Sequence, residues 1–263
     1  MGTLKRQLKY WLYNSVPGFA GRFPYYGTQV HFPPGAGTFR VICSQGSFEG
    51  EIVSRMVRLA RPKSTVFDVG ANIGLMAIPV LHSCPSCRVV SVEPSPSSLP
   101  YLQRTVAGSA YRDRWAVVPR AMSNQPGEMD FAIGRSRDAL FEGFTRPGSG
   151  ERSIRVSVST LDDEWVRLGR PDVSLIKIDV EGAEGLALDG AVQLLRAERP
   201  SLLIEWHEDY LKRLGTPVEQ ILQRARDWQY RIFTIPGGVL VDDADSLRVQ
   251  MFECSNFLLL PRD

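Results

Sequence analysis

The sequence has 263 residues, with 31 basic and 29 acidic side chains and a net charge of +2 at neutral pH. Hydrophobic residues make up 43% and charged residues 23%, which is typical of a globular protein and argues against disorder. No stretch approaches the roughly 20 apolar residues that cross a bilayer. These values exclude a membrane span, a collagen-like chain and a disulfide scaffold, and the balanced charge argues against an electrostatic nucleic-acid binder.

Residues 1–60 are predicted to form an N-terminal extension of a helix and short strands, packed on a main domain of residues 61–263. The apolar start of the chain is interrupted by Lys9, Asn14 and Pro17, so it does not read as a secretory signal. A helix packed on the main domain is the favoured interpretation. A basic amphipathic helix that touches a partner or a membrane surface is the alternative.

From residue 64 onward, short β-branched runs alternate with amphipathic stretches, which predicts an α/β domain with a parallel sheet. The predicted strands are residues 64–69, 88–93, 115–122, 173–180 and 201–207. The predicted helices are residues 73–82, 97–106, 183–197 and 218–228. Antiparallel pairs are expected between residues 127–133 and 153–159, and between residues 230–235 and 256–260.

The long segment 134–150 and the N-terminal extension fall outside this alternation, and binding specificity often resides in such loops. We therefore expect both to form the side of a cleft that binds an acceptor substrate. The segment's side chains suited to a polar or anionic acceptor are Arg135, Arg137, Phe141, Phe144 and Arg146.

Four cysteines, Cys43, Cys84, Cys87 and Cys254, are too few and too scattered for a disulfide framework. Cys84 and Cys87 have the spacing of a metal or redox motif, but no second such pair completes a zinc site. We expect a plain loop there, reduced cysteines and a cytoplasmic protein.

The most informative segment, residues 66–75, reads VFDVGANIGL. An apolar strand runs into Asp68 and then into a glycine turn, where the ends of parallel strands bind ligands. A dinucleotide fingerprint would carry glycines where Asn72 and Leu75 stand, so the turn fits pyrophosphate poorly. Glu93 ends the next strand and can accept two hydrogen bonds from ribose hydroxyls. A nicotinamide oxidoreductase is therefore the disfavoured alternative.

This segment, VEP at residues 92–94 and IKIDVEGAE at residues 176–184 resemble the FkbM-type family of S-adenosylmethionine-dependent methyltransferases. LDG at 188–190 and RPSLLIE at 199–205 extend the likeness. The resemblance implies a class I methyltransferase (Rossmann-like) fold, a seven-stranded, mostly parallel sheet with helices on both faces and an antiparallel last strand. It also implies O-methylation of a hydroxyl on a small-molecule, sugar, glycolipid or polyketide-type acceptor. Residues 102–105, LQRT, depart from the family's L-x-x-N.

Under this resemblance, Asp68 and the backbone of residues 70–74 hold the methionine part of the donor. Glu93 holds the ribose, Pro94 and Ser95 shape the adenine slot, and Glu49 is a candidate for the ammonium group. The complete predicted donor site is Glu49, Asp68, Gly70, Ala71, Asn72, Gly74, Glu93, Pro94, Ser95, Arg120, Ala121 and Met122.

The predicted catalytic residues are Asp179, Glu181, Glu205 and His207, at the ends of two central strands. Alternation along a strand puts Glu205 and His207 on one side, and a histidine suits proton transfer at neutral pH. A divalent metal held by Asp179 and Glu205 is possible, but the spacing does not require one. A nucleic-acid methyltransferase is disfavoured, since no N/D-P-P-Y tetrad occurs. A non-catalytic S-adenosylmethionine-binding module and the oligomeric state stay open.

Overall fold

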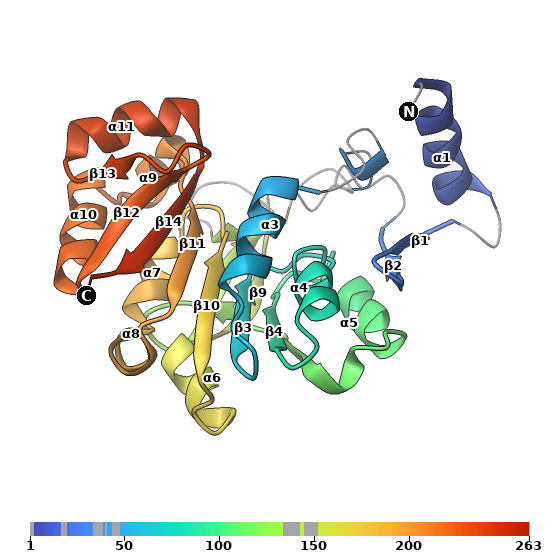
Figure 1. Ribbon diagram of the computed structural model, residues 1–263, viewed down its shortest axis with the longest axis horizontal. Helices are drawn as coiled ribbons and strands as arrows, with labels where there is room; N and C mark the ends of the chain where they lie inside the picture. Colours follow the sequence, from blue (N-terminus) through green and yellow to red (C-terminus); the bar gives the residue numbers. More distant parts are fainter. Residues whose placement is uncertain are drawn as a thin grey trace.

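The computed structural model describes residues 3–16, 20–33, 39, 41–43, 48–133, 143–144 and 152–262. Its centre is an eight-stranded sheet with helices on both faces (Figure 1). Across the sheet the strands are β13 (Leu240–Val241), β12 (Tyr230–Ile235), β14 (Asn256–Pro261), β11 (Ser201–Glu205), β10 (Val173–Ile178), β3 (Thr65–Val69), β4 (Arg88–Val92) and β5 (Trp115–Val118).

The five strands from β11 to β5 run parallel, and β14 runs antiparallel to both β11 and β12. The expected α/β fold with an antiparallel last strand is therefore confirmed. The expected count of seven strands is not, because the short β13 folds back onto β12 and adds an eighth strand at the edge.

Helices cover the sheet because neighbouring residues of a buried strand point to opposite faces, and both faces here are apolar. The helices that follow residue 49 are α3 (Gly50–Leu59), α4 (Ala77–Ser83), α5 (Leu99–Ala107), η1 (Arg112–Arg114), α6 (Leu161–Arg167), α7 (Glu184–Asp189), α8 (Val192–Glu198), α9 (Glu208–Leu214), α10 (Val218–Asp227) and α11 (Ala244–Glu253). Val66 belongs to the core formed with α3, α4 and α5, whereas its neighbour Phe67 belongs to the core formed with α6 to α11. No helix within the described residues is long and apolar enough to cross a membrane.

The N-terminal part consists of α1 (Thr3–Ser15) and the antiparallel pair β1 (Arg22–Tyr25) and β2 (Thr28–His31). Phe39 joins these pieces, because its ring stacks on Tyr10 and lies 4.8 Å from the ring of Phe23. The backbone N–H of His31 donates to Thr105 Oγ1 of α5 at 2.9 Å, which fixes β2 on the main domain. The division of the chain at residue 60 stays a prediction.

A second sheet has the order β6-β9-β7-β8, with β6 (Ala121–Met122), β9 (Ser153–Ser159), β7 (Gly127–Ala132) and β8 (Gly143–Phe144). The predicted antiparallel pairing of the two longer strands is confirmed. The prediction of one strand over residues 115–122 is wrong, since the chain leaves the main sheet at Pro119, which has no N–H to donate to a ladder. Most of the predicted acceptor segment, residues 134–142 and 145–150, lies outside the described residues.

The predicted helix over residues 183–197 is in fact two helices, α7 and α8, separated at Gly190. A Cβ atom on Gly190 would lie 2.1 Å from the carbonyl oxygen of Ser123, so only glycine lets these two backbone segments approach each other.

The loop between α4 and β4 contains a disulfide between Cys84 and Cys87, which corrects the expectation of reduced cysteines. The expected loop itself is present. The tight turn through Pro85 and Ser86 leaves the two Cα atoms 5.4 Å apart, within the span of a disulfide. Cys43 and Cys254 are free.

Candidate functional site

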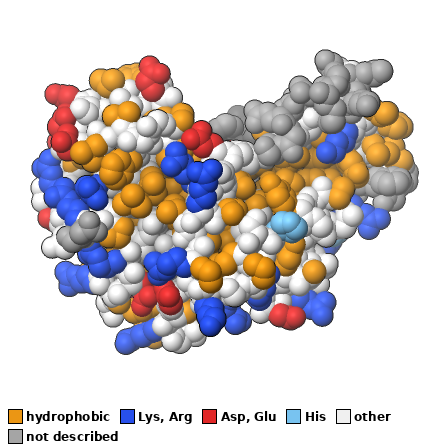
Figure 2. Space-filling view, in the orientation of Figure 1, with side chains coloured by type: hydrophobic (Ala, Val, Ile, Leu, Met, Phe, Trp, Pro, Cys, Tyr) orange, Lys and Arg blue, Asp and Glu red, His pale blue; other side chains and the backbone are white. Residues whose placement is uncertain are grey.

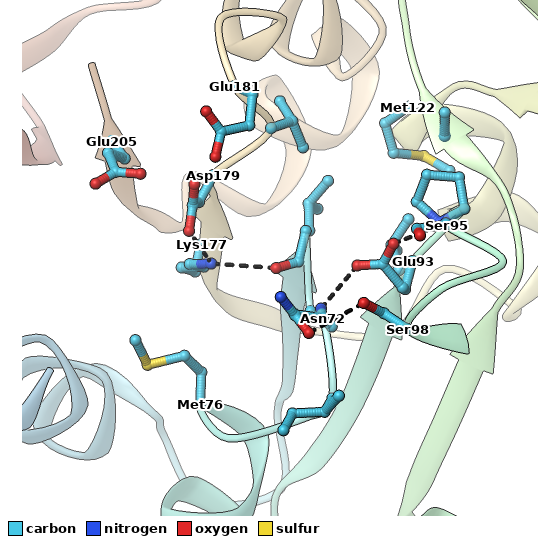
Figure 3. A pocket seen from close by; sticks show the side chains of 18 of the residues that line it. Asn72, Met76, Glu93, Ser95, Ser98, Met122, Lys177, Asp179, Glu181 and Glu205 are labelled. Atoms are coloured by element: carbon cyan, nitrogen blue, oxygen red, sulfur yellow. Dashed lines mark hydrogen bonds and ion pairs between the residues drawn. The ribbon is translucent and has the colours of Figure 1, made fainter. Parts of the chain in front are cut away.

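The site lies where four parallel strands end in register. Ile178 at the end of β10 pairs with Val69 of β3 and with Ile204 of β11, and Val69 pairs with Val92 of β4. The residues that follow these strand ends therefore meet at one edge of the sheet, where they line a cavity of about 280 Å³ (Figure 3).

Most of the predicted site residues line this one cavity. They are Glu49, Gly70, Ala71, Asn72, Glu93, Pro94, Ser95, Ala121, Met122, Asp179, Glu181, Glu205 and His207. The structure thus brings the predicted donor-binding and catalytic groups together from β6, from the ends of β3, β4, β10 and β11 and, for Glu49, from the start of α3.

Three predicted donor-site residues do not line the cavity. The side chain of Asp68 is fully buried beneath it. A Cβ on Gly74 would lie 2.7 Å from the Trp115 ring, so this glycine serves the packing of the turn against β5. Arg120 turns away, with its guanidinium 3.3 Å from the carboxylate of Glu164 on α6.

The glycine turn after β3 lines the cavity through Gly70, Ala71 and Asn72. Gly70 has a φ of +80°, and a Cβ there would lie 1.8 Å from the carbonyl oxygen of Asp179, so no other residue fits. Asn72 also has a positive φ of 49°, and asparagine tolerates that conformation better than most residues. Its side-chain oxygen accepts a hydrogen bond from Ser98 at 3.1 Å, which holds the turn against the start of α5.

Glu93 is fixed by backbone groups at one end of the cavity. One carboxylate oxygen accepts the N–H of Asn72 at 2.7 Å and the other accepts the N–H of Ser95 at 2.8 Å. The side chain is 6% exposed. Met122 lies on the same side of the cavity as Glu93 (Figure 3), and Pro94, the next residue in the chain, also lines it.

Lys177 dominates the other end, and the sequence analysis did not identify it. Its ammonium group lies 2.9 Å from Asp179 and 3.8 Å from Asp68, and it also donates to the carbonyl oxygen of Gly70 at 3.4 Å. Burial lowers the pKa of Lys177, but the carboxylates of Asp179, Asp68 and Glu49 outweigh it and raise the pKa above its ordinary value. This side chain therefore stays a cation throughout the physiological range.

Asp68 supports Lys177 from below. Both of its carboxylate oxygens are buried and accept no hydrogen bond from the described residues. Burial raises the pKa of Asp68, and the Lys177 ammonium opposes that rise. Buried charges persist only when they are paired, so Asp68 and Lys177 depend on each other.

Asp179 and Glu205 behave as one pair. Burial, the charge of Asp179 and a hydrogen bond between the two side chains raise the pKa of Glu205 to about 10. Burial acts to raise the pKa of Asp179, but Lys177 and the hydrogen bond with Glu205 lower it below its ordinary value. Glu205 therefore carries a proton at neutral pH and donates it to an ionised Asp179.

His207 extends this pair toward solvent. Its Nε2 lies 3.3 Å from one oxygen of Glu205, which also accepts a hydrogen bond from the Ser255 hydroxyl at 3.2 Å. The ring packs edge-on against Tyr210, with centroids 5.1 Å apart. The imidazole is thus oriented from two sides at the rim of the cavity.

A model of the methyltransferase FkbM domain matches residues 68–232, well over half of the chain. The chain belongs to the FkbM methyltransferase family. Its sheet, with the strand order and antiparallel β14 described above, has the class I methyltransferase fold expected for that family.

Two curated methyltransferases resemble the chain at low identity. The methyltransferase sdnD of Sordaria araneosa is 24% identical over 48% of this chain and 59% of its own length. The 2-O-methyltransferase NoeI of Sinorhizobium fredii is 24% identical over 69% of this chain and 78% of its own length. Among solved structures, methyltransferase FkbM from Methylobacillus flagellatus aligns over 85% of this chain and 54% of its own, with 17% identity and a TM-score of 0.47. The chain thus spans just over half the length of two of these three relatives.

The FkbM-type segment 176–184 holds a second residue that the sequence analysis missed. Glu184 is fully buried, and one of its oxygens accepts the N–H groups of Val180 and Gly182 at 3.1 and 3.0 Å. Burial raises its pKa to about 7, against the effect of these hydrogen bonds. Glu184 thereby holds the loop that follows Asp179, in which Glu181 has a φ of 56°.

Phe48, Met76, Ser98, Phe131 and Tyr210 also line the cavity without having been predicted. None of these five residues was assigned to the site from the sequence, so only the folded arrangement identifies them as lining the cavity. Among the described residues, no group of three or more His, Cys, Asp or Glu side chains is arranged to hold a metal ion.

Proposed function

We propose that this FkbM-family protein is an S-adenosylmethionine-dependent O-methyltransferase whose acceptor is a hydroxyl on a small-molecule, sugar, glycolipid or polyketide-type compound. The observation that carries the proposal is a single cavity with a backbone-held carboxylate, Glu93, at one end and a proton-sharing pair, Asp179 and Glu205, at the other. The name of the relative NoeI, a 2-O-methyltransferase, favours an oxygen acceptor.

The cavity fits the donor in charge. Glu49, Asp179 and Glu181 line it as carboxylates beside the protonated Glu205, and Lys177 is the one Lys or Arg among the described residues that line it. S-adenosylmethionine carries a positive sulfonium and a positive ammonium group against one carboxylate, so an acid-rich wall attracts it. The same wall repels the pyrophosphate of a nicotinamide dinucleotide.

The donor also fits in shape and hydrogen bonding. Glu93 can accept both ribose hydroxyls in addition to its backbone hydrogen bonds, because an ionised carboxylate offers about four acceptor sites. Pro94, Ala121 and Met122 offer an apolar slot for adenine. Gly70 and Ala71 line the same cavity, and we assign them to the methionine part of the donor.

Bound S-adenosylmethionine supplies an electrophilic methyl group on a positively charged sulfur. The chain must then orient the acceptor hydroxyl and take up its proton. If His207 Nε2–H donates to Glu205, its Nδ1 is left with a free lone pair, which makes this ring the proton acceptor. Glu205 keeps the ring in that tautomer. The opposite charges of Asp179 and Lys177 offset each other beside the reacting groups.

Calorimetry with S-adenosylmethionine and with a nicotinamide dinucleotide tests the donor assignment. We expect binding of the first alone. Incubation with a pool of hydroxylated metabolites then tests the reaction. We expect release of S-adenosylhomocysteine and a product heavier by one CH₂ unit, detected by mass spectrometry. Donor binding without either product indicates a non-catalytic module, and preferential dinucleotide binding refutes the proposal.

A further inference from the structure

Charge is distributed unevenly along this chain. The segment 1–48 contains five Lys or Arg and no Asp or Glu, so all 29 acidic side chains of the protein lie in the segment 49–263. Acidic side chains outnumber basic ones in that second segment, and the net positive charge of the protein therefore resides entirely in its N-terminal part. The segment 1–48 is also rich in aromatic residues. Such charge asymmetry is typical of segments that contact an acidic polymer or a membrane surface.

Helix α1 is rich in the basic and aromatic residues of this segment. Its sequence, TLKRQLKYWLYNS, contains three basic residues and no acidic one. Tyr10 and Tyr13 face the protein, where both contact the ring of Phe39. Leu8 and Trp11, three residues apart and thus neighbours on the other face, are 60% and 56% exposed. Hydrophobic side chains are visible on the surface at this end of the molecule in Figure 2.

A cationic pocket adjoins the end of this helix. Arg22, His31 and Arg104 line a cavity of about 400 Å³ together with Gly21, whose N–H donates to the carbonyl oxygen of Tyr13 in α1 at 3.0 Å. Burial and the charges of Arg104 and Arg22 lower the pKa of His31. The surface beside α1 is therefore positive, as its sequence predicts.

We propose that the face of α1 that exposes Leu8 and Trp11, in a helix whose charged residues are all basic, docks on the surface of an anionic lipid bilayer. An interfacial helix combines exposed Leu or Trp with Lys and Arg, and it lies in the plane of the membrane with its apolar side chains among the headgroups. Tryptophan favours that interface in particular.

A lipid surface fits this face better than a nucleic acid does. Nucleic acids attract the basic residues, but an exposed leucine gains nothing from a phosphate backbone. A bilayer satisfies both features, since acyl chains accept Leu8 and Trp11 while anionic headgroups attract the lysines and arginines. The helix is separate from the strand ends that line the donor cavity, so the proposal does not depend on the reaction assigned above.

Co-sedimentation with vesicles tests the proposal. The full chain is mixed with phosphatidylcholine vesicles and with vesicles that also contain phosphatidylserine. We expect binding to the anionic vesicles that weakens as salt rises, and little binding to the neutral ones. The double variant Leu8→Glu/Trp11→Glu should lower the affinity by more than about tenfold, because it removes the inserting side chains and adds charge repulsion.

Helix α11 offers a matched control. Val249 and Phe252 have the same spacing on that helix and are 59% and 82% exposed. The double variant Val249→Glu/Phe252→Glu should leave vesicle binding unchanged. Circular dichroism and S-adenosylmethionine affinity report whether each variant is folded. A second pair, Lys5→Ser/Lys9→Ser, keeps both apolar side chains and should lower binding to the anionic vesicles only.

Three results overturn the proposal. The first is a folded wild-type chain that does not sediment with anionic vesicles. The second is an equal loss of binding in the α1 and α11 double variants, which would mean non-specific adsorption. The third is duplex RNA or DNA binding that exceeds vesicle binding and survives in Leu8→Glu/Trp11→Glu, which would assign the basic residues to a nucleic acid instead.

Discussion

The two ends of the cavity hold carboxylates in different ways. At one end, the backbone amides of Asn72 and Ser95 fix both oxygens of Glu93. At the other end, charged side chains hold one another: Lys177 lies between Asp68 and Asp179, and Asp179 shares a proton with Glu205. The first arrangement follows from the local shape of two turns. The second requires charged groups from three strands.

Under the proposed function, this difference separates donor binding from chemistry. A carboxylate held by backbone amides keeps its position while a ligand enters or leaves, which suits the recognition of ribose hydroxyls. A network of coupled side-chain charges responds to a nearby proton or cation, which suits a step that creates and removes charge. Each of the following variants changes one side chain at one end of the cavity.

The largest expected effect is on the Lys177 end. Lys177→Met leaves the buried Asp68 and the partly exposed Asp179 without their cation, so we expect the free energy of unfolding to fall by about 3–5 kcal/mol. Urea unfolding measures this. The exposed Lys212→Met should cost less than about 1 kcal/mol. The double variant Lys177→Met/Asp68→Asn should recover part of the loss, and a single variant as stable as the wild type would contradict the charge coupling.

The next effect concerns His207. His207→Ala removes the proposed proton acceptor, so we expect turnover to fall by about 10²-fold or more. Donor affinity should stay unchanged, because the proton moves only during reaction. His82→Ala is the matched control, since that ring bonds Tyr111 on the surface and does not line the cavity. Near-normal turnover of a folded His207→Ala protein would exclude this residue as the base.

Glu93→Ala tests the binding end. Loss of a charge-assisted contact with ribose should weaken S-adenosylmethionine binding by about 1.5–3 kcal/mol, measured by calorimetry. The distant, exposed Glu128→Ala should have no effect. Unchanged affinity in a folded Glu93→Ala protein would leave the backbone-held carboxylate without its proposed role.

The sequence could predict the Glu93 end because its geometry is local. Glu93 ends a strand with an unmistakable apolar pattern, and the glycine turn beside it lies within one motif. Asp179, Glu205 and His207 could be placed at strand ends for the same reason. Their protonation could not be predicted, since it depends on which carboxylates meet after folding.

The wrong and missing site predictions also concern contacts that form only when the chain folds. Lys177 lies inside a strand that reads as buried and apolar, although it is two residues from Asp179 and so shares its side of the strand. Arg120 was placed in the donor site from its position alone, and an ion pair with Glu164 holds it elsewhere. Gly74 is part of the glycine motif, but it packs against the ring of Trp115 and does not line the cavity. Trp115 belongs to a strand much later in the chain, so the motif alone could not show this contact.

The smallest expected effect, and the sharpest test of the shared proton, is a change of stability with pH. Burial and Asp179 raise the pKa of Glu205 from 4.5 to about 10. The folded state therefore holds a proton that the unfolded state releases near pH 4.5. The stability that Glu205 contributes is fully present below that pH, and it is lost as the pH rises toward 10.

Glu205→Gln keeps a hydrogen-bond donor for Asp179 but does not titrate. Relative to the wild type, its free energy of unfolding should therefore rise by about 1 kcal/mol between pH 6 and pH 7, a window that lies between the two pKa values. Urea unfolding at both values measures the difference. Glu128→Gln, whose carboxylate is largely exposed, should differ from the wild type by the same amount at both. A flat difference for Glu205→Gln would mean that Glu205 is ionised in the folded protein, and the contrast between the two ends of the cavity would disappear.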